Sequence, residues 1–306
     1  MNQDQPQVMG IDLGGTTIKI GRFLRDGTCL ESWQISTPQP SSPGLVVESI
    51  SQVVNKVKEN HKIVALGIGT PGPTDVTGKI VRVAINLADW QDVPLADLLT
   101  SKTGLPTIIA NDANCAGLGE AWLGAGKEFN HLILLTLGTG VGGAIILDGK
   151  LYTGPQGGAG ELGLITLNPE GPVCNSGNNG SLEQYLSIAA IRRATGKEPL
   201  ELGKLAQAGD LEALEFWQSY GKILGVGLAS LIYVLTPEAV IIGGGVSASA
   251  EFFLPTTLQE IERRVLAISR VGLQLLKAEL GNNAGMVGAA KLAWQLVESH
   301  QIIYNR

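Results

Sequence analysis

Two glycine-rich turns, each flanked by apolar and β-branched runs, constrain this chain more than any other feature of its sequence. The first lies in Asp12-Leu-Gly-Gly-Thr-Thr-Ile-Lys19 and the second in Leu137-Gly-Thr-Gly-Val-Gly-Gly143. Such a pattern predicts a β-hairpin, because glycine supplies the positive φ that a tight turn needs. Backbone N–H groups at a turn without Cβ atoms let an anion approach closely. One such hairpin is typical of an ordinary turn, whereas two of them favour an enzyme that holds a phosphate chain from two sides.

The second turn also matches the dinucleotide-binding pattern G-x-G-x-x-G over residues 138–143. That pattern requires a helix directly after the glycines, whose N-terminus holds the pyrophosphate. Here the apolar run 144–147 ends at the turn signal Asp148-Gly149, which leaves no room for a helix. The Walker pattern G-x-x-x-x-G-K-[ST] is missing as well. We therefore expect phosphate binding by hairpins and not by a helix N-terminus.

Length and composition favour a two-domain globular protein. The chain has 306 residues, and this length is more than a single hydrophobic core usually serves. Of these residues, 44% are hydrophobic. The net charge of −6 and the lack of a Lys/Arg-rich run argue against a nucleic-acid partner. The longest apolar stretch, 223–235, is too short to cross a bilayer and predicts a buried helix. With a polar N-terminus and an odd count of three cysteines, we expect a cytoplasmic protein with reduced thiols and no membrane partner.

The pattern of apolar residues predicts alternating strands and helices in two related halves. Each half starts with a glycine hairpin, so we expect two α/β domains with a cleft between them and a boundary near Ala110. In the first half we predict strands at 29–36, 63–68 and 107–109, and helices at 45–59, 94–103 and 112–123. In the second half we predict helices at 211–235, 251–266 and 284–297, and strands at 239–242 and 271–276.

The run Asn111-Asp112-Ala-Asn114 lies where a predicted strand gives way to a helix. Asn and Asp are good helix N-caps, which is the simple interpretation of the run. A cap needs only one such residue, however, and neither register places Glu or Gln three positions later. The alternative is that Asp112 is a general base, kept ionised by the helix dipole and able to accept a hydroxyl proton. The run alone leaves both interpretations open.

Three further motifs have both a structural and a functional interpretation. Glu161 lies in a loop with few other side chains and can face a ligand or water. Glu183 opens a predicted helix, where an exposed acid is simply stabilised by the dipole. Gly243-Gly-Gly245 ends a buried strand, the place where ligands bind to α/β sheets, although a packing turn is equally consistent.

Taken in order, the motifs resemble the ROK family (repressors, open reading frames, kinases) of sugar kinases within the actin-like ATPase superfamily. The resemblance implies an α/β fold of two actin-like ATPase (ribonuclease H-like) domains that flank a central cleft. It places residues 1–110 plus 284–306 in the smaller domain and 111–283 in the larger one. The matching blocks cover essentially the whole chain: the two hairpins, Gly67-Ile-Gly-Thr-Pro-Gly-Pro73, Asn86-Leu87, Asn111-Asp-Ala-Asn114, Gly160-Glu-Leu-Gly163, Ile242-Gly-Gly-Gly-Val-Ser247 and Ala284-Gly-Met-Val-Gly288.

The resemblance also implies a role for each motif. Asp112 would take the proton from a sugar hydroxyl as that hydroxyl attacks the γ-phosphate of ATP, and Asp12 would bind Mg²⁺. Phosphoryl transfer depends mostly on positioning and electrostatics, which suits this assignment. The sugar would contact Asn86, Asn111, Asp112, Glu161, Glu183 and Gly72. The nucleotide would contact Asp12, Gly14, Gly15, Thr16, Thr17, Lys19, Gly138, Thr139, Gly140, Gly243, Gly244 and Gly245.

The chain departs from the family pattern in one block. Family members typically carry one His and three Cys that bind a structural zinc, and the His also contacts the sugar in many of them. The corresponding positions here are Leu164, Cys174, Ser176 and Ser181. Because serine and leucine cannot replace thiolate and imidazole, we expect no structural zinc. We expect hydrogen bonds within the loop 169–180 to hold it in place of the metal.

The sequence thus predicts a ROK-type hexokinase that forms a homodimer and phosphorylates glucose at its 6-hydroxyl with ATP. Within enzymes, the alternatives are another hexose (mannose, fructose or an N-acetylhexosamine) and polyphosphate as donor. Outside enzymes, the alternatives are a sugar-binding module without activity and a sugar-responsive repressor. Family repressors carry a DNA-binding domain before the Asp-Leu-Gly-Gly block, where this sequence has eleven residues, so we expect no repressor.

Overall fold

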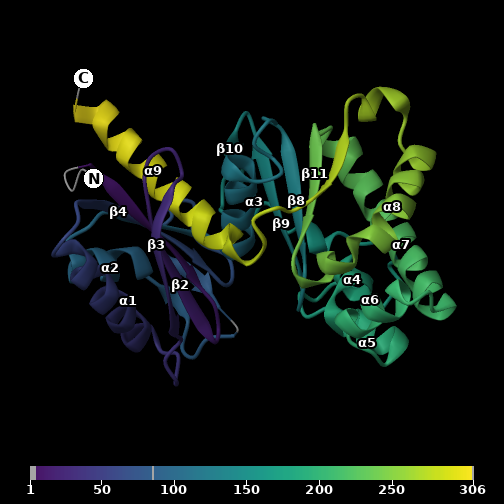
Figure 1. Ribbon diagram of the computed structural model, residues 1–306, viewed down its shortest axis with the longest axis horizontal. Coiled ribbons are helices and arrows are strands. Elements are labelled where there is room, and N and C mark those ends of the chain that lie inside the picture. The colour runs from purple at the N-terminus through teal and green to yellow at the C-terminus, as the bar shows by residue number, and fades with distance from the viewer. Residues whose placement is uncertain (1–4, 85, 305–306) are drawn as a thin grey trace. The chain divides into compact units, whose positions relative to one another are not determined.

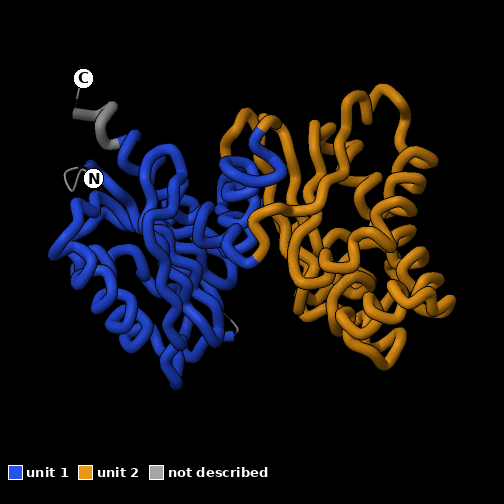
Figure 2. The backbone as a smooth tube through the Cα atoms, in the orientation of Figure 1, with its two compact units in different colours: residues 1–127, 151–159, 282–306 blue, residues 128–150, 160–281 orange. Residues whose placement is uncertain are grey.

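The computed structural model describes residues 5–84 and 86–304, and the chain divides into two compact units (Figure 2). Unit 1 comprises Met1–Lys127, Leu151–Ala159 and Asn282–Arg306. Unit 2 comprises Glu128–Lys150 and Gly160–Gly281. The first helix after Ala110 thus belongs with unit 1, one helix beyond the expected boundary, because it packs along the C-terminal helix of that unit.

Unit 1 is built on a five-stranded sheet in which three antiparallel strands are extended by two parallel strands (Figure 1). The strand order is β3-β2-β1-β4-β7, with β1, β4 and β7 parallel to one another. The strands are β1 (Gln7–Leu13), β2 (Thr17–Phe23), β3 (Cys29–Ser36), β4 (Ile63–Thr70) and β7 (Thr107–Asn111). A separate two-stranded sheet of β5 (Val81–Val83) and β6 (Gln91–Val93) is too short and too exposed to be read from the sequence pattern.

Two pairs of helices cover the sheet of unit 1. Helices α3 and α9 pack closely on one face, because Gly10 and Gly67 lack the Cβ that would collide with the α9 backbone. The side chains that alternate with these glycines, such as Ile11 and Leu66, point into the opposite core with α1 and α2. The helices are α1 (Pro43–Lys58), α2 (Leu95–Thr103), α3 (Asp112–Leu123) and α9 (Ala284–Tyr304).

Unit 2 repeats the strand arrangement of unit 1. Its sheet has the order β10-β9-β8-β11-β12, which again is a hairpin followed by two parallel strands. The strands are β8 (Leu132–Leu137), β9 (Val141–Leu147), β10 (Lys150–Leu151), β11 (Ala239–Gly243) and β12 (Gln274–Lys277). The predicted pair of related α/β halves is therefore confirmed. The last strand begins at Gln274 and not at 271, because a turn with Gly272 at φ +74° precedes it.

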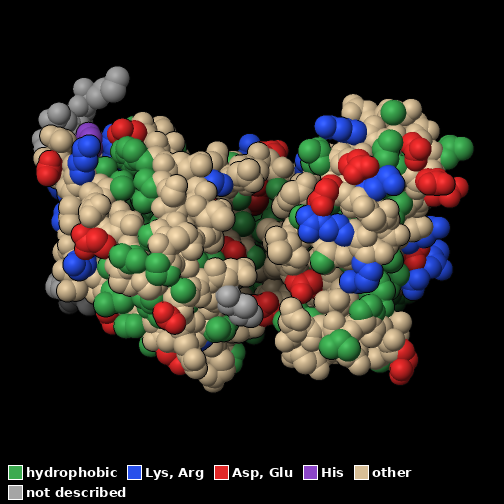
Figure 3. Space-filling view, turned by 90° about the horizontal axis from the view of Figure 1, so that it is seen from below, with side chains coloured by type: hydrophobic (Ala, Val, Ile, Leu, Met, Phe, Trp, Pro, Cys, Tyr) green, Lys and Arg blue, Asp and Glu red, His purple; other side chains and the backbone are tan. Residues whose placement is uncertain are grey.

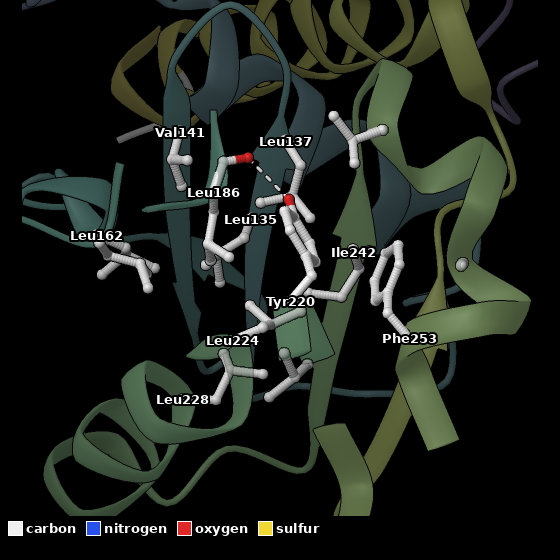
Figure 4. Packing of buried hydrophobic residues seen from close by; sticks show 14 of the residues in the cluster. Leu135, Leu137, Val141, Leu162, Leu186, Tyr220, Leu224, Leu228, Ile242 and Phe253 are labelled. Atoms are coloured by element: carbon white, nitrogen blue, oxygen red, sulfur yellow. Dashed lines mark hydrogen bonds between the residues drawn. The ribbon is translucent and has the colours of Figure 1, made fainter. Parts of the chain in front are cut away.

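The core of unit 2 lies between this sheet and two long helices that run in the same direction (Figure 4). The rings of Trp217, Tyr220 and Phe253 pack with centroids 5.2–5.7 Å apart. The Tyr220 hydroxyl, fully buried, donates to the carbonyl of Leu186 at 2.7 Å. The helices are α4 (Glu183–Leu186), α5 (Ile188–Thr195), α6 (Pro199–Gln207), α7 (Leu211–Leu235) and α8 (Ala250–Arg264).

Helix α7 is the one described helix whose length and composition would suffice to cross a membrane. Half of its most apolar window is buried inside the protein. Leu224, Leu228 and Ile232 of this helix are fully buried in the core of unit 2. Its hydropathy is therefore that of a core helix, as the sequence predicted.

Candidate active site

The strand ends of unit 1 bring the predicted acidic residues to one edge of the sheet. Because β1, β4 and β7 are parallel, their carboxyl ends meet at the same edge. Asp12 near the end of β1 pairs with Gly69 of β4, and Thr70 pairs with Asn111 at the end of β7. Helix α3 begins at the next residue, Asp112. The sheet register thus places Asp12, Asn111 and Asp112 at one edge.

Asn111 is the cap of helix α3. Its Oδ1 accepts the N–H groups of Ala113 at 2.9 Å and Asn114 at 3.3 Å. Its Nδ2 donates to the carbonyl of Gly72 at 3.2 Å. Gly72 has φ +78°, and a Cβ there would collide with the carbonyl of Val83, so only glycine fits. Asn111 therefore ties the helix start to the Gly72 loop, and it shares the N–H of Ala113 with its neighbour Asp112.

Asp112 has a side chain that solvent reaches, at the N-terminus of α3. Its Oδ1 accepts the N–H of Ala113 at 2.8 Å. Desolvation by the surrounding protein raises the pKa of Asp112, and hydrogen bonds from Ala113 and the Asn111 side chain oppose the rise. A carboxylate that is accessible and somewhat more basic than usual suits a general base.

Asp12 is the second titratable group at this edge. Burial raises the pKa of Asp12 to about 6; the Lys19 ammonium lowers it, and the Asp112 carboxylate raises it further. Lys19 lies opposite Asp12 in the β1–β2 ladder, and its Nζ donates to the carbonyl of Asn282 at 2.6 Å. A Cβ added to Gly285 in the first turn of α9 would lie 3.0 Å from the Asp12 carboxyl group, so glycine keeps that space open.

The donors at this edge fit a magnesium ion that takes few protein ligands. Mg²⁺ is usually held by one or two carboxylates, with water and substrate phosphates as its other ligands. Asp12 and Asp112 provide such carboxylates. Within the described residues, no group of three or more His, Cys, Asp and Glu side chains forms a closed metal cage.

The first hairpin is held by hydrogen bonds from the residue after β3. The Thr37 hydroxyl donates to the carbonyl of Gly14 at 2.7 Å, and the Thr37 N–H donates to the carbonyl of Thr16 at 3.0 Å. Within the turn, the Gly14 N–H donates to the carbonyl of Thr17 at 3.0 Å. The backbone oxygen of Asn86, an exposed residue, lies beside Gly15. Sequence reasoning missed Thr37, because its contact spans 23 residues.

The second hairpin, between β8 and β9 of unit 2, is held from a different segment. The Gly138 N–H donates to the carbonyl of Gly140 at 2.9 Å within the turn. The Ile188 N–H donates to the carbonyl of Gly138 at 2.8 Å. The Val141 N–H donates to Oε2 of Glu183 at 2.9 Å. The start of α4 and the start of α5 thus both hold the turn.

The reason for glycine in the two hairpins differs from the prediction. Gly14, Gly15, Gly138 and Gly140 lie outside the positive-φ region, so the expected need for positive φ was wrong. At two of these positions, Gly14 and Gly140, glycine provides space. A Cβ at Gly14 would lie 2.9 Å from the carbonyl of Thr17, and one at Gly140 would collide with the Glu183 carboxylate.

The glycine turn 243–245 of unit 2 lies directly beside the second hairpin. Gly244 has φ +81°, and a Cβ there would collide with the backbone of Leu137, at the end of β8. The Ser247 hydroxyl donates to the carbonyl of Gly244 at 2.7 Å and closes the turn. The predicted adenosine turn and the predicted phosphate turn are therefore neighbours.

Glu161 reaches the same end of the unit 2 sheet from another loop. It is exposed and precedes a short 3-10 helix, Leu162–Leu164. The segment lies against β9, because a Cβ at Gly163 would collide with the carbonyl of Val141. Val141 therefore lies between the segment that carries Glu161 and the half-buried Glu183.

The four positions of the family's zinc block do not fit a zinc ion. Cys174 has a free, buried thiol, and the Ser176 hydroxyl lies 3.3 Å from its sulfur. One thiol, two hydroxyls and a leucine are not the thiolate and imidazole donors that zinc needs. Instead, Nδ2 of Asn178 donates to the carbonyl of Leu164 at 3.2 Å and to Oγ1 of Thr166 at 2.8 Å. An amide side chain thus bridges the loop to the segment that follows Glu161.

Comparison with known proteins decides the family. Residues 8–296 match the ROK family. The chain belongs to the ROK family. It is 35% identical to the glucokinase of Halalkalibacterium halodurans, with 94% of each chain covered. The solved structure of a ROK family glucokinase from Streptomyces griseus, in complex with glucose and AMPPNP, is 36% identical with a TM-score of 0.79 and covers 94% of this chain and 99% of its own. The ROK hexokinase of Thermus thermophilus is 33% identical with a TM-score of 0.84, covering 96% and 99%.

Proposed function

We propose that this ROK protein is a hexokinase that transfers the γ-phosphoryl group of ATP to the 6-hydroxyl of a hexose, with glucose as the preferred sugar. The observation that carries the proposal is the division of roles at the start of α3. Asn111 caps the helix, which leaves the accessible carboxylate of Asp112 for a substrate. The similarity to glucokinases over nearly the whole chain supports the same activity.

Asp112 would act as the general base. Its raised pKa increases its affinity for the hydroxyl proton. The hydroxyl oxygen then attacks the γ-phosphorus, the bond to the β-phosphate oxygen breaks, and ADP leaves. Phosphoryl transfer relies mainly on positioning and charge stabilisation. Mg²⁺ bound at Asp12 would supply positive charge for the transferred group.

The remaining candidate residues would bind the two substrates. The turns 14–17 and 138–140, with Lys19, would hold the phosphates, and the turn 243–245 would hold the adenosine. Sugar specificity follows from polar groups that are left unpaired when a hydroxyl is missing. Leu164 stands where many family members have a sugar-contacting His, so the preference among hexoses depends on the other residues. We propose as sugar contacts Asn86, Asn111, Asp112, Glu161, Glu183 and Gly72.

We further propose that the enzyme works in the cytoplasm as a homodimer and feeds glycolysis. Figure 3 shows basic and acidic side chains interspersed over the face that it draws, and the net charge is negative. Neither feature suits a nucleic-acid partner, which needs a concentrated positive surface. Light scattering on the purified protein measures its mass directly, and a monomer would contradict the homodimer.

A panel of sugars and donors tests the proposal. Glucose, mannose, fructose and N-acetylhexosamines are each offered with Mg²⁺ and either ATP or polyphosphate, and the sugar phosphate formed is measured. We expect the highest kcat/KM for glucose with ATP. A higher value for another hexose would correct the substrate, and a higher value with polyphosphate would correct the donor. If no combination of sugar and donor gives a sugar phosphate, the proposed kinase activity is rejected and a sugar-responsive regulator is favoured.

A further inference from the structure

The carboxylate of Glu183 holds the turn of the second hairpin. Glu183 is the first residue of α4, and its Oε2 accepts the N–H of Val141, 42 residues earlier in the chain, at 2.9 Å. Glycine at position 140 makes room for this contact, since a Cβ there would collide with the same oxygen. Hydrogen bonds from N–H groups to carboxylates are stronger than those between neutral groups. One oxygen of Glu183 is therefore already engaged by the backbone of the hairpin.

A second contact fixes the other side of the same turn. The Ile188 N–H, at the start of α5, donates to the carbonyl of Gly138 at 2.8 Å. Ser187, which is buried, caps α5 through the N–H of Ala190 and so fixes the backbone next to this contact. The segment 183–188 thus forms hydrogen bonds with the turn on both sides of Thr139. A change in the position of this segment necessarily moves the turn.

We propose that Glu183 is a positioning residue for the donor phosphates as well as a sugar ligand, and that it couples the two substrates. This inference rests on the proposed function. With one carboxylate oxygen on the Val141 N–H, the other is left to accept a sugar hydroxyl. A bound sugar then fixes the carboxylate, and through it the turn that binds phosphate. By thermodynamic linkage, sugar and nucleotide strengthen each other's binding by the same factor.

Binding of the ATP analogue AMPPNP, measured by calorimetry with Mg²⁺ in the absence of sugar, isolates this role. We expect Glu183→Ala to bind AMPPNP about tenfold more weakly than the parent, because the turn loses a charge-assisted hydrogen bond. Glu183→Gln should restore the affinity, because its amide oxygen can accept the same N–H. Glu183→Asp keeps the charge but is one methylene too short to reach Val141, and it should bind as weakly as the alanine variant. Gln184→Ala, the next residue of the same helix, is the matched control and should bind as the parent does.

Repeating the titrations with saturating glucose measures the coupling. Glucose should tighten AMPPNP binding in the parent, and this gain should disappear in Glu183→Ala and Glu183→Asp. If both variants bind AMPPNP like the parent without sugar, Glu183 is a sugar ligand alone and the inference is wrong. If the alanine variant does not fold, the aspartate variant decides the question by the same comparison. A folded parent that does not bind AMPPNP at all would instead reject the proposed function, and the inference with it.

Discussion

The two glycine hairpins occupy the same position in two sheets of the same strand order. They differ in the residues that hold each turn and in the charged residues that flank it. The first lies beside a pair of opposite charges on its own strands, Asp12 and Lys19, and is held by Thr37. The second is flanked by strands without a charged residue and is held by Glu183 and Ile188 from a separate helical segment. The repeated scaffold thus provides a backbone turn twice, while the residues that we propose for proton and metal chemistry, Asp112 and Asp12, lie in unit 1.

The largest expected effect concerns the proton acceptor of unit 1. Asp112→Asn keeps the shape of the side chain but cannot take the hydroxyl proton, so kcat should fall by roughly 10²–10⁴. Asp148→Asn in unit 2 is the matched control, since its side chain is 87% exposed at a hairpin tip and should leave kcat unchanged. Steady-state kinetics with glucose and ATP measure both. A kcat for Asp112→Asn within a few-fold of the parent would show that unit 1 does not supply the base.

The next effect concerns two glycines of unit 2. Gly244→Ala forces a side chain into a positive-φ position and against the Leu137 backbone, which should cost roughly 2–5 kcal/mol of unfolding free energy. At Gly138 nothing lies near an added Cβ, so Gly138→Ala should cost less than about 1 kcal/mol. It should nevertheless raise the KM for ATP by placing a methyl group where phosphate approaches. Urea unfolding and kinetics separate the two effects. Equal stability of the two variants would contradict this account of the turns.

A smaller, pH-dependent effect belongs to the loop that carries Gly72 in unit 1. The loop desolvates Asp75, which would raise its pKa, but the Thr77 hydroxyl and the N–H groups of Ile80, Lys79 and Thr77 lower that pKa to about 2. Because the folded-state pKa is below the unfolded value, the stabilisation is present above about pH 4 and lost as pH falls toward 2. Asp75→Asn should therefore lower the free energy of unfolding by roughly 1–3 kcal/mol at pH 7.

Thermal unfolding of the parent and Asp75→Asn at several pH values measures this difference. The gap between the two should be constant from pH 5 to 7 and should close toward pH 2. A gap that is independent of pH down to 2 would mean that the Asp75 charge does not hold the loop.

The smallest effect is expected in the loop 169–180 of unit 2, which is held by neutral groups. Asn178→Ala should lower stability by about 1 kcal/mol, because three side-chain hydrogen bonds are lost. Asn175→Ala in the exposed part of the same loop is the control and should change little. A chelator should leave the melting temperature unchanged, since a structural zinc would stabilise by binding the folded state. Stoichiometric zinc in the purified protein by elemental analysis would overturn this expectation.

Local patterns predicted much of the fold. The hairpins, α3 and the long helix α7 follow from glycine turns and from apolar periodicity, and α3 begins and ends at the predicted residues. The short strands β5 and β6 and the helices α5 and α6 were missed, because each is short and has few buried residues. The roles of the candidate residues come from the family resemblance and stay predictions.

The contacts that support the site could not be predicted, because they join residues far apart in the chain. Thr37 reaches Gly14 across 23 residues, Asn111 reaches Gly72 across 39, and Glu183 reaches Val141 across 42. Such pairs depend on how strands and loops pack, which a local pattern does not contain. For the same reason, the sequence suggested positive φ as the purpose of the hairpin glycines, whereas the structure shows that neighbouring groups occupy the space beside Gly14 and Gly140.

The transfer of a phosphoryl group from ATP to a sugar hydroxyl can be followed by ³¹P NMR of a single reaction mixture. The parent enzyme is incubated with ATP, Mg²⁺ and glucose while the phosphorus signals are followed. We expect the γ-phosphate signal of ATP to be lost while ADP and a sugar 6-phosphate ester appear in equal amounts. Inorganic phosphate appearing in place of the ester, or an unchanged ATP signal at high enzyme concentration, would contradict this expectation.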